Sequence, residues 1–389
     1  MTHRTDNGKG FEMERKVLLN PGPATTTDTV KQAQVVPDIC PREKEFGEVM
    51  EELSRDLLRV VHADAERYSA VLFCGSGTLN MDVCINSLLP AGKKILVVNN
   101  GAYSARAVGI CRAYGLDCID LSFPVDGPPD LGKVAETLER EPGIAVVYTT
   151  HQETGTGVLN PVREIGALAH GAGAISIVDT TSTLAMRPID IGKENMDFCM
   201  ASAQKGLQAM TGLSFVIGRR DIIEASREYP VRSYYCNLFR QYDYFRRTGQ
   251  MQFTPPVQTI YAARQALKEY FAEGEERKWS RHQRTMAAIH AGLARLGFEE
   301  AIPLEYQAGL VAAVKYPKDP NWDFDRIHDC CYGRGFTIYP GKMQEQGTFR
   351  LCALGAIDEG DIEKFFVVLE EALREQSVKI PVNEALGRR

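Results

Sequence analysis

Short apolar runs alternate with helix-like stretches between residues 68 and 181, and this alternation constrains the fold more than any other feature. The apolar runs are YSAVLFC (68–74), KILVVN (94–99), DCIDLSF (117–123), IAVVYTT (144–150) and AISIVDTT (174–181). Strands that alternate with helices predict a mostly parallel sheet covered on both faces. We therefore expect an α/β fold in which ligands bind at the carboxyl ends of the strands.

The pattern changes after about residue 256, where two long helical stretches are followed by shorter mixed elements. This change predicts a smaller α+β domain at the C-terminal end. The expected division is a large domain over 17–270 and a small domain over 271–375, and the N-terminal segment of the large domain can pack with the small one. Polar tails are expected at 1–16, frayed or disordered, and at 376–389.

Composition excludes several classes of function. A net charge of −6 gives no basic footprint for nucleic acid or an anionic membrane. No apolar run approaches the ~18 residues of a membrane span, and the first residues lack the apolar core of a secretory signal. The ten cysteines show neither CxxC nor zinc-ligand spacing. We expect reduced thiols in a cytoplasmic protein without a metal site, and a catalytic cysteine is the weaker alternative.

Three features fall where predicted strands end. CGSGTLN (74–80) closes one strand and opens a helix, whose free N–H groups suit a phosphate. It lacks the third glycine of a dinucleotide fingerprint and the GK[ST] of a P-loop, and a tight turn with an N-cap is the alternative. Asp179 ends a second strand and needs a cationic partner if it is buried, although it could be only a cap. Tyr103 follows a third strand, where an aromatic side chain often serves packing.

Lys205 stands between two apolar runs, DFCMAS (197–202) and LSFVIGRR (213–220). An ammonium group there is costly to desolvate unless it has a partner or has reacted. Taken alone, Lys205 could be a solvated turn residue or the partner of a nearby carboxylate. Taken with Asp179, the phosphate loop and Tyr103, it completes the set that pyridoxal phosphate requires. The lysine would condense with the aldehyde, the aspartate would pair with the ring nitrogen and the tyrosine would cover the ring.

At these residues the chain resembles the class V aminotransferases of fold type I, and within them the 2-aminoethylphosphonate–pyruvate transaminases. The similar pieces are LLNPGPATTTDTV (18–30), CGSGT (74–78), NNGAYSAR (99–106), HQETGTGVLNP (151–161), IVDTTS (177–182), SAQKG (202–206), QFTPPVQT (252–259), GFTIYPGK (335–342) and TFRLCALG (348–355). Each piece is weak alone, but their order and spacing make the resemblance specific. It implies a large domain with a mostly parallel seven-stranded sheet and a smaller α+β C-terminal domain.

The resemblance also implies roles for individual residues. Lys205 and Asp179 would be catalytic, with Lys205 as the Schiff-base lysine. The implied cofactor-binding residues are Ser76, Gly77, Thr78, Tyr103, Thr154, Thr156, Asp179, Gln204, Lys205 and Thr254. Thr254 would come from the neighbouring subunit, because these enzymes are homodimers with shared active sites. Arg350 would hold the acidic end of the substrate, since an arginine fork suits a carboxylate or a phosphonate, and Arg42 and Thr25 are further substrate-binding candidates.

The implied reaction interconverts 2-aminoethylphosphonate and pyruvate with phosphonoacetaldehyde and alanine, in ping-pong half-reactions. One stretch departs from the degradative enzymes: VVPDICPREKEFGEV (35–49) is more like other class V transaminases, including those associated with phosphonate biosynthesis. The physiological direction therefore stays open. An alanine–glyoxylate or serine–pyruvate transaminase of the same class is the alternative reading. A non-catalytic binding protein would not need both Lys205 and Asp179.

Overall fold

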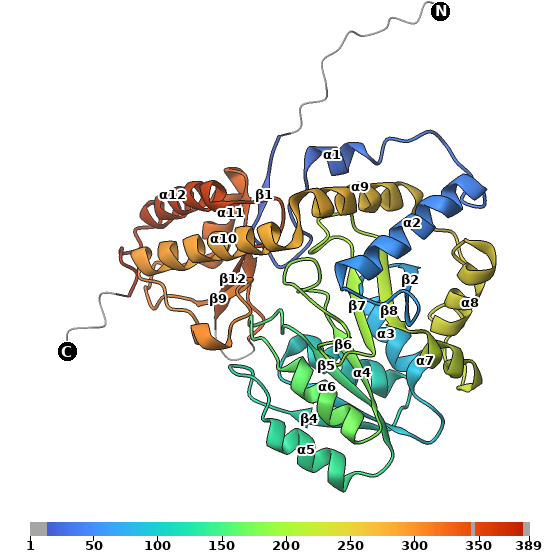
Figure 1. Cartoon of the computed structure of the whole chain (residues 1–389). Coiled ribbons are helices and arrows are strands. Elements are labelled where there is room, and N and C mark those ends of the chain that lie inside the picture. Colours follow the sequence, from blue (N-terminus) through green and yellow to red (C-terminus); the bar gives the residue numbers. More distant parts are fainter. Residues whose placement is uncertain (1–13, 344–346, 384–389) are drawn as a thin grey trace, which may run out of the picture.

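The computed structural model describes residues 14–343 and 347–383 of the chain (Figure 1). The largest element of the fold is a seven-stranded sheet in the order β2-β8-β7-β6-β5-β3-β4. Its strands are β2 (Tyr68–Cys74), β3 (Lys94–Asn99), β4 (Cys118–Ser122), β5 (Ile144–Thr150), β6 (Ile175–Asp179), β7 (Phe198–Ser202) and β8 (Leu213–Arg219). Only β8 runs antiparallel to its neighbours in this sheet. The predicted mostly parallel, seven-stranded sheet is confirmed.

Helices cover both faces of this sheet. Because alternate residues of a strand point to opposite faces, each strand packs against helices on both sides. Along β8, Phe215 and Ile217 pack in one hydrophobic cluster, whereas Val216 between them packs in another. The helices of this part are α1 (Asp28–Gln32), α2 (Lys44–Val60), α3 (Gly77–Leu88), α4 (Ala102–Ala113), α5 (Leu131–Arg140), α6 (Val162–Gly171), α7 (Arg220–Ala225), α8 (Leu238–Thr248) and α9 (Val257–Glu273), with the 3-10 turn η1 (Ser226–Glu228). A strand covered by helices on both faces is expected to be apolar along most of its length. β7 agrees with this expectation, because all of its residues are buried.

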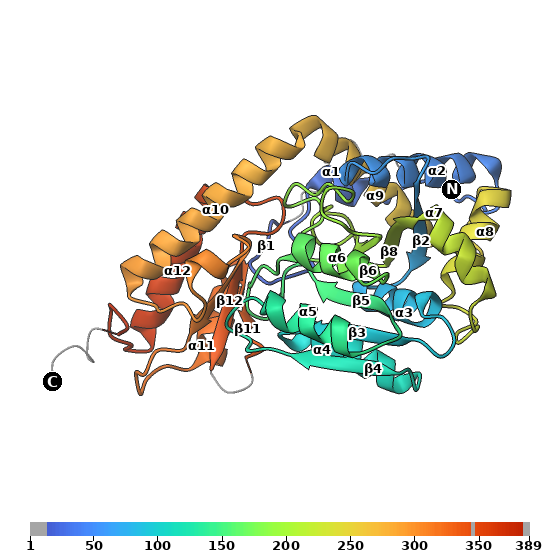
Figure 2. The same ribbon diagram turned by 60° about the horizontal axis from the view of Figure 1, so that its bottom comes forward.

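The C-terminal part has its own small sheet and its own core. Strands β9 (Val311–Lys315), β11 (Tyr339–Pro340) and β12 (Thr348–Cys352) form an antiparallel sheet in the order β11-β12-β9. The helices here are α10 (Glu275–Leu296), α11 (Phe324–Gly333) and α12 (Glu359–Glu375), with the 3-10 turn η2 (Leu304–Tyr306). Figures 1 and 2 show α10 running from the end of α9 across to these elements. None of the helices in the described residues is both long and apolar enough to cross a membrane.

The beginning of the chain packs on this C-terminal part. Strand β1 (Val17–Leu18) pairs in parallel with β10 (Phe336–Thr337), and Arg15 forms an ion pair with Asp361 on α12. The predicted polar tail from residue 376 is wrong for its first residues, because the side chains of Val378 and Val382 are buried in the C-terminal core. Residues 1–13 and 384–389 lie outside the described chain. We keep the domain boundary near residue 270 as a proposal, since α9 and α10 meet at Gly274.

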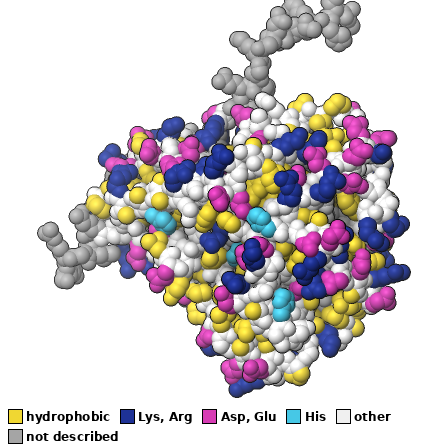
Figure 3. Space-filling model, in the orientation of Figure 1, with side chains coloured by type: hydrophobic (Ala, Val, Ile, Leu, Met, Phe, Trp, Pro, Cys, Tyr) yellow, Lys and Arg dark blue, Asp and Glu magenta, His cyan; other side chains and the backbone are white. Residues whose placement is uncertain are grey.

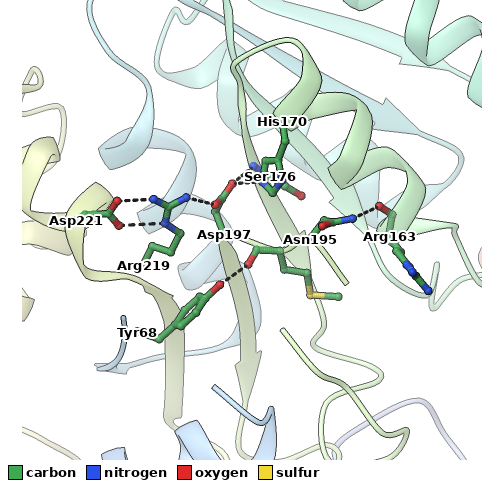
Figure 4. A network of polar contacts seen from close by, with 9 residues as sticks. Tyr68, Arg163, His170, Ser176, Asn195, Asp197, Arg219 and Asp221 are labelled. Atoms are coloured by element: carbon green, nitrogen blue, oxygen red, sulfur yellow. Dashed lines mark hydrogen bonds and ion pairs between the residues drawn. The ribbon is translucent and has the colours of Figure 1, made fainter. Parts of the chain in front are cut away.

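A network of polar contacts holds the amino end of β7 (Figure 4). The buried carboxylate of Asp197 contacts Arg219 Nη1 at 3.0 Å, His170 Nε2 at 2.8 Å and the Ser176 backbone N–H at 2.8 Å. Arg219 also pairs with Asp221. A buried carboxylate is tolerated only when partners of this kind compensate its desolvation. On the surface, in contrast, positive and negative side chains are interspersed over the visible face (Figure 3).

Candidate active site

The predicted site residues meet at the carboxyl ends of β2, β5, β6 and β7, where they line a cavity of about 160 Å³. The lining includes eight of the residues predicted from the sequence: Ser76, Gly77, Thr78, Tyr103, Thr154, Asp179, Gln204 and Lys205. A wider cleft of about 660 Å³ lies beside the cavity and is lined in part by Thr156, the ninth. We take the smaller cavity as the site, because it brings together Lys205, Asp179 and the turn that precedes α3.

Lys205 reaches this cavity from the loop that follows β7. Its side chain is only 9% exposed, and it has no hydrogen bond or ion pair within the described chain. Its Nζ lies 5.6 Å from the centre of the Tyr103 ring. The pKa of the Lys205 ammonium is lowered from 10.5 to about 8, mainly by burial; Asp179 opposes this shift, and Arg350 and Arg106 contribute to it. An amine in such surroundings is a ready nucleophile, because much more of it is neutral near pH 7.

This pKa gives a prediction for the apoprotein. We expect the rate at which pyridoxal phosphate attaches covalently to Lys205 to rise with pH and to reach half its maximum near pH 8. The sign follows from the neutral amine, which is the reactive form and becomes dominant above the pKa. The rate can be followed by absorbance after mixing at a series of pH values. A rate still rising steeply at about pH 10 would instead indicate an ordinary lysine.

Asp179 ends β6 with its carboxylate in the cavity and only 4% of the residue exposed. Its Oδ1 accepts a hydrogen bond from the Thr181 backbone N–H at 2.9 Å, and the Tyr148 hydroxyl lies 3.5 Å from Oδ2. Both of these hydrogen-bond partners are neutral, and the Asp179 carboxylate forms no ion pair within the described residues. A protonated ring nitrogen would supply the missing positive partner.

The turn between β2 and α3 faces the cavity with the amino end of a helix. Gly77 begins α3, and a Cβ added there would lie 2.9 Å from the Thr181 side chain, so only glycine leaves this approach open. The hydroxyls of Thr181 and Ser202 are buried and have no hydrogen-bond partner among the described residues. Free hydroxyls beside a helix N-terminus suit a phosphate group. The residues present therefore fit pyridoxal phosphate at both its phosphate and its ring nitrogen.

Two charged residues that hold Tyr103 are missing from the sequence-based prediction. The buried carboxylate of Glu153 accepts hydrogen bonds from the backbone N–H groups of Tyr103, Ser104 and Gly155 at 3.1–3.3 Å. It thus fixes the start of α4. Arg106, one turn further along α4, has its guanidinium 4.9 Å from the Tyr103 ring centre and donates to Thr78 Oγ1 at 2.9 Å. Both residues lie in pieces that carry the resemblance, HQETGTGVLNP (151–161) and NNGAYSAR (99–106). The sequence-based prediction uses only the hydroxyl residues and Tyr103 of these pieces.

Arg350 lies next to the cavity on β12 and is buried, with 1% of its surface exposed. Its guanidinium donates to the carbonyl oxygen of Pro340 at 3.0 Å and to that of Thr154 at 3.3 Å. It has no carboxylate partner within the described residues. A buried cation held only by neutral carbonyl oxygens is poised to bind an acidic group.

Three predicted residues do not reach the cavity in this chain. Arg42 donates to the backbone carbonyls of Met251 and Gln252, and Thr25 Oγ1 accepts from the Leu18 backbone N–H. Both side chains thus contact backbone groups outside the lining of the cavity, and their contact with substrate stays a prediction. Thr254 is exposed on the surface.

Comparisons with known proteins agree with this geometry. The family model described as "Aminotransferase class-V" matches residues 29–315. A 2-aminoethylphosphonate–pyruvate transaminase of Cupriavidus necator is 34% identical over 372 residues, covering 95% of this chain and 98% of the relative. One from Lysinibacillus sphaericus is 32% identical, covering 92% and 97%.

Solved structures show the same fold. The ureidoglycine–glyoxylate aminotransferase of Bacillus subtilis superimposes with a TM-score of 0.87 at 19% identity, covering 97% of this chain and 98% of that one. The alanine–glyoxylate aminotransferase of a Nostoc species gives 0.86 at 24% identity, covering 95% and 98%. The protein belongs to the class V aminotransferases and is a pyridoxal phosphate-dependent enzyme of fold type I.

Proposed function

We propose that the enzyme interconverts 2-aminoethylphosphonate and pyruvate with phosphonoacetaldehyde and L-alanine. The observation that carries the proposal is the buried guanidinium of Arg350, which lies beside Lys205 without a carboxylate partner in the described chain. Both substrates have an acidic group that such a fork can hold. The choice of a phosphonate is supported by relatives of that name at 32–34% identity over nearly the whole chain.

The residues of the cavity divide the work of the reaction. Bound pyridoxal phosphate supplies the aldehyde that takes up the amino group and a ring that withdraws electrons from the neighbouring carbon. Lys205 Nζ, as a positioned base, moves a proton from and to the substrate carbon that bears nitrogen. The Asp179 carboxylate holds the proton on the ring nitrogen, Tyr103 covers the ring, and Arg350 orients the acidic group of donor and acceptor in turn.

The enzyme would work as a homodimer in the cytoplasm. Thr254 is exposed next to Phe253, whose ring stacks on Tyr235 at 4.7 Å between centres, and Tyr234 beside them is 71% exposed. A second copy of the chain would cover these aromatic side chains, and its Thr254 would then complete the phosphate site. All ten cysteines are free thiols, as a reducing compartment requires.

A panel of amino donors tests this function. With pyruvate as acceptor, we expect 2-aminoethylphosphonate to give the highest kcat/KM, with one alanine formed per phosphonoacetaldehyde. β-Alanine is the matched control donor, because it has a carboxylate in place of the phosphonate on the same two-carbon chain. Serine and alanine with glyoxylate test the alternative reactions of the class. Fast turnover of these pairs without turnover of the phosphonate would reject the proposal.

A further inference from the structure

Lys342 is a cation at the mouth of the active site that none of the roles above employs. It follows the short strand β11, and its Nζ lies 5.2 Å from the centre of the Tyr103 ring. Its side chain lines the wide cleft beside the cavity and is solvent-exposed there. In the part of the chain that the structure describes, its ammonium group has neither an ion pair nor a hydrogen bond.

The backbone fixes Lys342 relative to Arg350. The Pro340 carbonyl accepts from Arg350 Nε at 3.2 Å as well as from Nη2, and the Gly341 N–H donates to the Thr348 carbonyl at 2.7 Å. A Cβ on Gly341 would collide with Thr348, so the two strands approach closely only with glycine there. Arg350 thus lies on β12, and Lys342 lies two residues after the end of its antiparallel partner β11.

Positive charge is in excess around Tyr103. Arg106, Lys205 and Lys342 all lie 4.9–5.6 Å from its ring centre. Partial burial, and then Arg106 and Arg350, lower the pKa of Lys342, while Glu153 raises it. Glu153 offsets part of this charge, but its single carboxylate, which accepts backbone N–H groups, faces three cations. Like charges held this close favour the binding of an anion between them.

The cofactor phosphate does not account for all of these cations. Its site lies at the amino end of α3, and Arg106 is tied to that site by its hydrogen bond to Thr78. Lys205 serves the chemistry. Arg350 and Lys342 remain; Arg350 contacts the cavity residue Thr154, and Lys342 lines the cleft beside the cavity. An arginine fork satisfies the two oxygens of a carboxylate, whereas a phosphonate has three oxygens and carries up to two negative charges.

We propose that Lys342 binds the third oxygen and the second charge of the phosphonate, and that it thereby sets the preference of the enzyme for phosphonate over carboxylate donors. The inference rests on the proposed function. Arg350 holds the acidic group common to both substrates, and Lys342 acts only when that group is a phosphonate. Pyruvate and alanine, with one negative charge on the carboxylate, do not need it.

The variant Lys342→Met tests this assignment, because methionine has a similar length but no charge. We expect kcat/KM for 2-aminoethylphosphonate to fall about 10- to 100-fold, as for the loss of one charge-assisted hydrogen bond. The values for β-alanine and pyruvate should change less than about threefold, and Lys342→Arg should retain most of the preference. Arg350→Ala, in contrast, should weaken both substrates together.

A binding measurement on the holoenzyme tests the same assignment without relying on catalytic turnover. Methylphosphonate and acetate are titrated calorimetrically against the wild type, Lys342→Met and the control Lys315→Met. Lys315 lines the same cleft, but its ammonium already pairs with Glu299. We expect the Lys342→Met variant alone to lose affinity for methylphosphonate, again about 10- to 100-fold, and to keep its affinity for acetate.

The outcomes separate the inference from the function on which it rests. If the wild type uses 2-aminoethylphosphonate and Lys342→Met keeps the wild-type preference over β-alanine, Lys342 is only a solvated lysine and the inference is wrong. If Lys342→Met loses affinity for methylphosphonate and acetate equally, Lys342 binds the acidic group common to both, and the inference about specificity is wrong. If the loaded wild type transaminates other donors but not the phosphonate, the proposed function itself fails.

Discussion

The variant Lys205→Ala should lose transaminase turnover almost completely while the protein still folds and holds pyridoxal phosphate without a covalent bond. Loss of a positioned base alone costs about 10²- to 10⁴-fold in rate, and the covalent attachment is lost as well. The fold should tolerate the change, because the Lys205 ammonium has no partner to orphan within the described chain and its removal relieves a buried charge. Borohydride reduction followed by peptide mass analysis should find the cofactor fixed at Lys205 in the wild type only.

A second lysine makes this test stringent. Lys278 on α10 is also buried, and burial lowers the pKa of its ammonium to about 7, below that of Lys205. Its Nζ, however, donates to the Gly206 carbonyl at 2.8 Å, and it lines a different pocket. A low pKa is therefore not sufficient for the role. Cofactor trapped at Lys278, or trapped at all in Lys205→Ala, would show that the catalytic lysine has been assigned wrongly.

The sequence predicts the centre of the site well because its residues lie at strand ends. Asp179 ends β6 and Lys205 follows β7, and each is preceded by an apolar run that is easily recognised. In a parallel sheet the carboxyl ends of neighbouring strands meet at one edge, so residues far apart in the sequence come together. Local pattern and topology together are then sufficient to bring these two side chains into one cavity.

The surroundings of the site could not be predicted in the same way. Glu153 acts by accepting backbone N–H groups of α4, and Lys342 acts through its distance from Tyr103. The contact of Glu153 depends on how the loop after β5 approaches α4. The position of Lys342 depends on how the segment after β11 approaches Tyr103 on α4. No residue spacing in the sequence encodes such an approach, so these side chains look like ordinary surface charges until the fold is known.

For Arg42, which the sequence suggests as a further cation for substrate, the structure shows contacts with backbone carbonyl groups and not with the cavity lining. An arginine in the stretch 35–49 is a plausible binding residue for an acidic substrate. Its long side chain, however, can also donate hydrogen bonds to backbone carbonyl groups near its own loop. Arg42 Nη1 donates to the Met251 carbonyl at 2.6 Å and so joins the loop before α2 to the loop before α9. The further cations that the described structure does bring to this region are Arg106, which lines the cavity, and Lys342, whose Nζ lies 5.2 Å from the Tyr103 ring centre.

Replacing Asp179 with asparagine should lower kcat by about 10²- to 10³-fold with little change in KM. Asparagine has the same shape, and its Oδ1 can still accept from the Thr181 N–H, but it cannot carry the negative charge. Without that charge the ring nitrogen of bound cofactor loses its proton more easily, and the ring withdraws electrons less well. The magnitude corresponds to about 3–4 kcal/mol, within the range typical of removing one partner of a buried ion pair. Steady-state kinetics and the pH dependence of the cofactor absorbance measure the effect.

The matched control is the other buried carboxylate at an end of this sheet, Asp197. It lies at the amino end of β7, where Arg219 and His170 contact it, and it has no access to the cavity. Asp197→Asn should therefore lower the melting temperature while leaving kcat per folded enzyme unchanged. Asp179→Asn should do the reverse, because it removes a buried charge that forms no ion pair within the described residues. If Asp179→Asn retained nearly normal kcat and only melted earlier, Asp179 would be a structural cap of the turn at Thr181 and not the partner of the cofactor.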